Sequence, residues 1–483
     1  AEQLDAMAPS IDELLNDFDL DEAPAPLVPD RLIRPPARTW LPRLAVALAT
    51  AALVLLIVGG VAVVSQLGRE TPVVTEPTPD VTLPTVETLP DPPQNAPVDP
   101  SGDLVWQRVS TDVFSDSGTD EDLAVAFGNG RYVAVGSVLE AGYDPPPIID
   151  AGSTGVAPRD AAVWVSGDGE SWSRVPHDEA VFGGEGAWVM KKVVFAGGQF
   201  LAVGEELAEG DLAIWVSADG LTWTRVTDEN GALGGGTRFG FEVIDVTFGD
   251  AGYVVIGKEY STEQRQVALV SPDGLTWERV RIELVDTLEV LRAVSFGSVG
   301  YVAVGNSPQY PLTAFVIVSS DGLQWSHPGD TELWVDPPDG VLAYTPMDVV
   351  FEDGRYVSVG WMQTTTGPHA GVWVSSDALQ WTLAYHDPRD RTSIDVITHG
   401  AFGYVALGSQ GIDNDSPDIN VWASPDGLEW RQVEVDAAVF GGPGSQSVWA
   451  AASGESGFVV VGAGSTDLER RLFEAILWRG VSP

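Results

Sequence analysis

The sequence predicts an all-β fold, a seven-bladed β-propeller, from three observations. A turn of the form Ser-x-Asp-Gly-x-x-Trp recurs about every 50 residues, five times with glycine and once with Ala378 in its place. A strand of apolar and aromatic residues that ends in glycine, such as Tyr253–Gly257, recurs seven times. The outer-strand pattern Trp-x-Arg-Val also occurs once by itself, within Val105–Val109, before the first complete repeat.

Each repeat contains four strand-like segments. In the repeat that includes Trp277 they are Val243–Phe248, Tyr253–Gly257, Val267–Ser271 and Thr276–Val280. Turns rich in Gly, Asp and Pro separate them, and glycine in the Asp-Gly turn accepts a positive φ at little cost. Ala378 in that conformation carries a penalty of roughly 1–2 kcal/mol. Because the last repeat lacks an outer strand, we expect Val105–Val109 to complete it and close the ring.

The recurring turn resembles the Asp-box of sialidase-like (BNR-repeat) propellers, in a shortened variant that lacks one residue between Asp and Gly. The resemblance covers residues 104–480. It implies that the turn aspartates stabilise hairpins at the blade periphery and are not catalytic; they are Asp168, Asp219, Asp273, Asp321, Asp377 and Asp426. A similar repeat occurs in actinobacterial exported proteins, so the resemblance also implies a bacterial, extracytoplasmic protein.

The same resemblance argues against a standard sialidase. The family's Arg-Ile-Pro signature is absent. The regularly placed arginines follow or adjoin the outer-strand Trp, far from a central channel, and we expect them to pair with acids along the rim; they are Arg108, Arg174, Arg225, Arg279 and Arg431.

Three segments precede the predicted propeller. Residues 44–66 form a predicted transmembrane helix, because the run from Leu44 to Val64 is uncharged and its 21 residues span about 30 Å. Four arginines precede this run and one follows it closely, which places residues 1–43 in the cytoplasm and the propeller outside the cell membrane. Residues 67–103 are rich in Pro and Thr, which is typical of an extended linker.

The cytoplasmic tail contains one predicted helix. Ser10 and Glu13 match a capping box, and Ile11, Leu14 and Phe18 share a face. Residues 10–22 are either a docking helix for a cytoplasmic partner or a solvated acidic tail. The marginal stability of a short isolated helix favours the second interpretation.

The composition excludes several classes of function. A formal net charge of −45 argues against nucleic-acid partners. The absence of cysteine excludes disulfides, thiolate metal sites and cysteine nucleophiles. The common motifs for zinc proteases, nucleophile elbows and phosphate loops are also missing. His177 and His386 occupy equivalent places in two repeats, which indicates repeat inheritance and not a metal site.

No cofactor is expected, although two loops carry closely spaced carboxylates of the kind that calcium prefers. One is the loop 112–122. The other contains Asp413, Asp415 and Asp418. Neither loop matches the EF-hand pattern.

Charged residues interrupt the register of the innermost strands. Asp245 and Asp348 lie three residues before the phenylalanines of their strands, and Lys192 lies at the same place in another repeat. The other repeats have small or apolar residues there: Ala124, Ala293, Val396 and Ala450. In one interpretation these charges form a polar cluster at the channel, in which the two aspartates act as a glycosidase pair. In the other they bind backbone groups or channel water. The second interpretation is favoured, because buried polar groups need hydrogen-bond partners in any case.

The connections from outer to next inner strand carry the ligand-binding candidates. Trp188, Trp334 and Trp449 lie in or beside them, where tryptophan either stacks on sugar rings and protein partners or packs between blades. Together with Lys192, these residues favour a membrane-anchored, non-catalytic binding module for a wall glycan or a protein on the outer side. A glycoside hydrolase and a transmembrane sensor are the alternatives.

Overall fold

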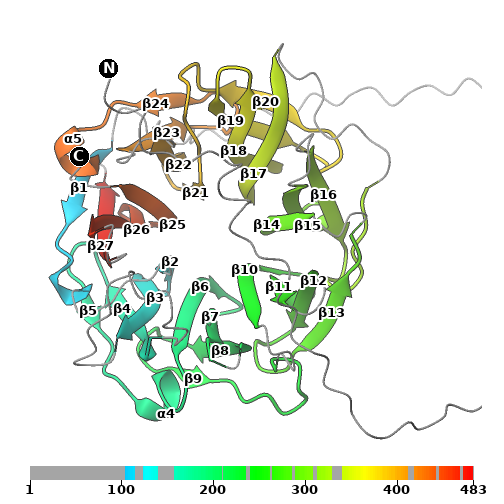
Figure 1. Cartoon of the computed structure of the whole chain (residues 1–483). Helices are drawn as coiled ribbons and strands as arrows, with labels where there is room; N and C mark the ends of the chain where they lie inside the picture. Colours follow the sequence, from blue (N-terminus) through cyan, green and yellow to red (C-terminus); the bar gives the residue numbers. More distant parts are fainter. Residues whose placement is uncertain are drawn as a thin grey trace, which may run out of the picture. The chain divides into compact units, whose positions relative to one another are not determined.

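The computed structural model describes residues 104–114, 123–139, 157–208, 210–234, 240–260, 264–284, 289–307, 313–328, 340–411, 418–441, 445–467 and 472–481. Within these ranges seven antiparallel sheets are arranged radially around a central axis (Figure 1). The predicted seven-bladed propeller is therefore confirmed.

Six blades follow one another along the chain. Blade 1 contains β2 (Ala124–Gly128), β3 (Arg131–Leu139), β4 (Arg159–Ser166) and β5 (Ser173–Arg174). Blade 2 contains β6 (Trp188–Ala196), β7 (Gln199–Glu206), β8 (Asp211–Ser217) and β9 (Thr224–Arg225). Blade 3 contains β10 (Phe241–Gly249), β11 (Gly252–Tyr260), β12 (Gln264–Ser271) and β13 (Glu278–Ile282).

Blade 4 contains β14 (Val290–Gly297), β15 (Gly300–Ser307) and β16 (Thr313–Ser319). Blade 5 contains β17 (Val341–Glu352), β18 (Arg355–Thr364), β19 (Pro368–Ser375) and β20 (Thr382–His386). Blade 6 contains β21 (Val396–Gly400), β22 (Gly403–Gln410), β23 (Asp418–Ser424) and β24 (Arg431–Val433). Short helices follow three outer strands: η1 (Asp112–Phe114), α4 (Glu179–Phe182) and α5 (Ala437–Phe440).

Blade 7 joins the two ends of the propeller. It contains β25 (Gln446–Gly454), β26 (Gly457–Asp467) and β27 (Leu472–Val481), and β1 (Val105–Val109) supplies its outer strand. β1 pairs antiparallel with β27, from Val105 opposite Val481 to Val109 opposite Leu477. The predicted closure by the N-terminal strand is therefore confirmed.

Blade 4 differs from the prediction of four strands. In its described residues the outer strand is reduced to a single bridge between Val318 and Ser326. Pro328 follows two residues later, and because proline has no N–H it cannot continue the ladder.

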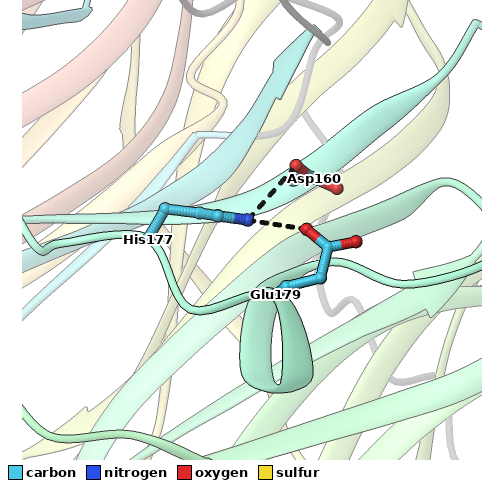
Figure 2. Close-up of side chains that lie close together, drawn as sticks. All are labelled: Asp160, His177 and Glu179. Carbon is cyan, nitrogen blue, oxygen red and sulfur yellow. Dashed lines mark hydrogen bonds and ion pairs between the residues drawn. The ribbon is translucent and has the colours of Figure 1, made fainter.

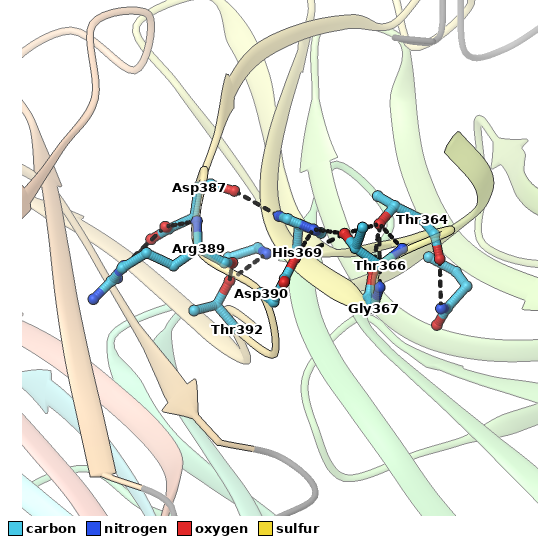
Figure 3. Close-up of polar contacts among 10 residues, drawn as sticks. Thr364, Thr366, Gly367, His369, Asp387, Arg389, Asp390 and Thr392 are labelled. Atoms are coloured by element: carbon cyan, nitrogen blue, oxygen red, sulfur yellow. Dashed lines mark hydrogen bonds and ion pairs between the residues drawn. The ribbon is translucent and has the colours of Figure 1, made fainter. Parts of the chain in front are cut away.

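Two recurring side chains link each blade to the one before it. The second-strand tyrosines Tyr132, Tyr301 and Tyr404 donate to backbone oxygens of the preceding blade's inner hairpin, at 3.0 to 3.1 Å. Third-strand tryptophans donate through Nε1 to the connection that enters their blade, as Trp215 does to the Val181 oxygen at 2.7 Å. In blade 6 the acceptor of Trp422 is the carboxylate of Asp387, which Arg389 holds at 2.6 Å (Figure 3).

The Ser-Asp-Gly turn has the same hydrogen bonds in its five copies with glycine. In blade 2, Oδ1 of Asp219 accepts from the N–H groups of Leu221 and Thr222, and Oγ of Ser217 accepts from the N–H of Gly220. The indole of the following Trp donates to the oxygen of the turn glycine. Ala378 takes the glycine position with a φ of 57°, so it adopts the left-handed conformation whose cost the sequence analysis considered.

No helix among these described ranges is long and apolar enough to cross a bilayer. The segment 44–66, the tail 1–43 and the linker 67–103 lie outside the described residues, and the assignments made for them stay predictions.

Deletion of residues 104–109 should destabilise the whole propeller. The deletion exposes the edge of β27 and removes the buried side chain of Val109 and the edge-on contact of Trp106 with Phe440. We expect the free energy of unfolding, measured with guanidinium chloride, to fall by several kcal/mol. Deletion of residues 90–103 is the control. Equal stability of the two deletions would show that β1 pairing does not hold the ring.

Candidate functional site

Two rings of residues, which lie on the inner strands or directly before them, surround the central axis. The mouth ring is formed by the residue at one equivalent position in every blade: Leu123, Lys191, Ile244, Arg292, Met347, Asp395 and Trp449. The channel ring is formed by the next residue in each blade: Ala124, Lys192, Asp245, Ala293, Asp348, Val396 and Ala450. These seven channel-ring residues are the ones that the sequence analysis compared between repeats, because charged residues interrupt an otherwise small or apolar position.

β-Bulges explain why two consecutive residues face the same space. Side chains in a regular strand alternate between its two faces, so neighbours point apart. In five blades the pairing of the first two strands skips one residue, and the skipped residue is the mouth-ring residue: Lys191, Ile244, Arg292, Met347 and Trp449. A bulge of this kind redirects a side chain without ending the strand.

The mouth ring borders a cavity of about 650 Å³, which Glu242, Lys258 and Tyr260 also line. The channel beneath it has a volume of about 170 Å³. The upper cavity is the larger and the more aromatic of the two, because Trp449 borders both spaces and Tyr260 borders only the upper one. A ligand much larger than benzene therefore fits at the mouth and not in the channel.

Basic residues gather at the mouth of an otherwise acidic protein. The chain has three lysines, and all of them, Lys191, Lys192 and Lys258, line the cavity together with Arg292. Lys191 pairs with Glu205 at 3.2 Å, and Nζ of Lys258 lies 4.6 Å from the centre of the Tyr260 ring. The mouth is thus a mixed-charge site, with cations placed beside carboxylates.

The channel aspartates bind backbone groups of the next blade. Oδ2 of Asp245 accepts from the N–H of Val294, and Oδ2 of Asp348 accepts from the N–H of Ile397, both at 2.9 Å. Oδ1 of Asp348 accepts from its neighbour Val349 at 2.8 Å. Backbone binding, one of the two interpretations offered by the sequence, is therefore present at both aspartates.

Burial also changes the ionisation of the channel acids. It raises the pKa of Asp348 to about 7, and the nearby charge of Asp245 adds to this increase. It raises the pKa of Asp395 to about 6 and that of Asp245 as well, although Lys192, 3.9 Å from Asp245, opposes the latter shift. The channel therefore holds acids that titrate near neutral pH.

The three predicted tryptophans lie in different places. Trp449 belongs to the mouth ring, and Trp334 lies outside the described residues. Trp188 lies on the inner strand of blade 2, where it packs against the core of blades 1 and 2 and the guanidinium of Arg225 stacks over it at 4.0 Å. Lys192 and Trp449 thus share one site, and Trp188 is apart from it.

The structure describes only some of the other residues that the sequence analysis singled out. Asp413 and Asp415 lie outside the described residues, and only the backbone of Asp418, in β23, is described. Arg279 approaches Glu259 at 3.4 Å, as expected of the rim arginines, but Arg225 donates to the backbone oxygen of Gly183. His177, for which the sequence predicts no ligand partners, lies beside two carboxylates.

Sequence reasoning missed Arg292, Asp395 and Tyr260. The first two directly precede channel-ring positions, and strand alternation alone would direct such residues to the opposite face. Aligning the seven repeats one residue earlier would have found them, since a bulge at that position is common to five blades.

No protein-family model matches the chain, and no curated protein matches its sequence. Among solved structures, YCF48 bound to D1 peptide is 14% identical, with a TM-score of 0.43 over 80% of this chain and 98% of that chain. The phage phi92 endosialidase is 11% identical, with a TM-score of 0.41 over 79% and 69%. A Trypanosoma rangeli sialidase is 13% identical, with a TM-score of 0.38 over 59% and 54%. These scores are too low to support a function.

Substitution Asp348→Asn should flatten the pH dependence of stability. Because the pKa of this carboxyl is raised from 3.8 to about 7 in the folded state, folding retains a proton that the unfolded chain releases. Its contribution to stability is present below about pH 4 and is lost as the pH rises through about 7. The slope for one such group is at most about 1.4 kcal/mol per pH unit. Urea unfolding at several pH values measures it, and an unchanged slope in the variant would contradict the assignment.

Proposed function

We propose that this chain is a non-catalytic binding protein and that its ligand, a glycan of the cell wall, occupies the mouth cavity. The observation that supports the proposal is the combination of a cavity of about 650 Å³ with the aromatic side chains of Trp449 and Tyr260. Aromatic rings present flat apolar faces on which sugar rings stack. Polar groups around them supply the donors and acceptors that orient a ligand.

The mouth carries such polar groups on several blades. Lys258 and Arg292 offer donors, and Glu242 and Asp395 offer acceptors for hydroxyl groups. The hydroxyl of Tyr260 donates to Glu242, which fixes the ring at the cavity wall. Because these residues come from blades 3, 4 and 6, a bound glycan would contact several blades at once.

The state of the channel aspartates favours binding over catalysis. A glycosidase acid or nucleophile needs a carboxylate oxygen directed at the substrate. Both oxygens of Asp348 instead accept hydrogen bonds from backbone N–H groups, and one oxygen of Asp245 does the same. The channel that holds them is also much smaller than the cavity above.

One observation keeps a glycoside hydrolase as the second candidate. The raised pKa of Asp348, about 7, is that of a carboxyl group that could protonate a leaving group at neutral pH. Asp245 lies close enough to contribute to that increase. The pair therefore has the electrostatic character of two coupled carboxyls, as well as a structural role.

The anchor belongs to the same proposal. Residues 44–66 would hold the protein in the cell membrane, and the linker 67–103 would carry the propeller towards the wall. A sensor function through residues 10–22 and a protein ligand on the outer side remain predictions from the sequence.

Substitution Trp449→Ala should weaken glycan binding about tenfold or more, because stacking on one aromatic face is lost. A panel of wall glycans is offered to the purified full-length chain, and bound ligand and released sugar are read in the same wells. Trp188→Ala is the matched control, since Trp188 lies outside the mouth.

Three outcomes have distinct meanings. Binding that Trp449→Ala loses and Trp188→Ala keeps supports the proposal. Released sugar that disappears in Asp348→Asn would replace it with the hydrolase. An absence of both signals from every glycan in the panel would refute the glycan proposal.

A further inference from the structure

Three metal-ligating side chains converge at the edge of blade 1, away from the mouth. Asp160 comes from β4, His177 from the connection after β5, and Glu179 from the first residue of α4 (Figure 2). Nε2 of His177 lies 3.1 Å from Oε2 of Glu179 and 3.6 Å from Oδ2 of Asp160. One ligand atom from each residue lies within 4.8 Å of the others. This is compact enough for a single ion to contact all three.

The backbone positions Glu179 for this role. Its Oε1 accepts from the N–H of Gly184 at 3.0 Å, so that Oε2 is directed at His177. Asp160 is half-buried, whereas His177 and Glu179 are exposed, so an ion can reach the site from solvent.

The chain itself contains a matched turn without this site. α5 follows blade 6 as α4 follows blade 1, and both turns share the pattern Asp-x-Ala-Val-Phe-Gly-Gly. In both, the aspartate caps the helix by accepting an N–H two residues later, at 3.0 Å for Asp178 and 2.8 Å for Asp436. In both, the Val oxygen accepts from a tryptophan of the next blade.

The matched turn has Val435 and Ala437 where the first turn has His177 and Glu179. The turn therefore folds without the imidazole and without the second carboxylate. The turn does not need His177 and Glu179 to fold, and their presence in blade 1 is not explained by the structure of the repeat.

We propose that Asp160, His177 and Glu179 bind one Zn²⁺ ion. One imidazole nitrogen and two carboxylate oxygens are ligands that zinc accepts, and three protein ligands leave one position for water. Calcium prefers oxygen ligands alone, so the imidazole selects against it. The ion would tie β4 to α4, whose next residue, Gly183, accepts from Arg225 of blade 2. It would thus strengthen the junction between blades 1 and 2.

Calorimetric titration of Zn²⁺ into the purified, EDTA-treated and dialysed full-length chain tests the proposal. We expect His177→Ala to bind one equivalent of zinc fewer than wild type, or to bind that equivalent at least about tenfold more weakly. Zinc should also raise the melting temperature of the wild type more than that of the variant. Any other zinc site is present in both proteins and cancels in the difference.

Asp178→Asn is the control. It removes one carboxylate beside the cluster and keeps the helix cap, because asparagine caps as well as aspartate. Zinc binding that is retained in this variant and lost in His177→Ala supports the site. Equal loss in both variants would show non-specific attraction to acidic surface. The proposal would be overturned if wild type and His177→Ala bound zinc equally. It would also be overturned if wild type bound no zinc up to about 1 mM, which corresponds to a binding free energy weaker than about 4 kcal/mol.

Discussion

The pairing of β1 with β27 is the constraint on which the rest of the structure depends. Strands from the two ends of the propeller form one sheet, so no blade edge at the junction is left unpaired. Closure in turn forces all seven inner strands to begin around one axis. The mouth ring and the channel ring exist only because seven equivalent positions, distant in sequence, are brought to the same depth.

Buried acids join neighbouring blades along that axis. A carboxylate in the channel loses hydration, which raises its pKa. Hydrogen bonds from backbone N–H groups replace part of the lost hydration. Asp245 links blade 3 to blade 4, and Asp348 links blade 5 to blade 6. The tyrosines and tryptophans farther out on the blades make the same kind of link from side chain to neighbouring backbone, so the ring is held at several radii.

The sequence predicts the fold well because the repeat is dense and its count is unambiguous. Seven second strands, six turns and a lone outer strand at Val105–Val109 leave one arrangement that closes. The channel ring could be predicted too, since Asp245 and Lys192 stand out against small residues in the same register. Arg292 could not, because a bulge reverses the face that strand alternation assigns to it. Asp395 could not either, because it directly precedes β21 and so has no strand register. The neighbours of His177 were missed because Asp160 lies on another strand, and adjacency across a blade has no local sequence signal.

The bulges also determine how this protein can vary. A bulged residue has no partner across the sheet, so its side chain is not constrained by strand pairing. Its neighbour in the channel ring, by contrast, is paired and packed. Exchange of a bulged side chain such as Met347 therefore leaves the strand pairing intact, whereas Trp449 also packs against the core between blades 7 and 1. The lining of the mouth cavity can thus change one blade at a time while the strands around it keep the same pairing.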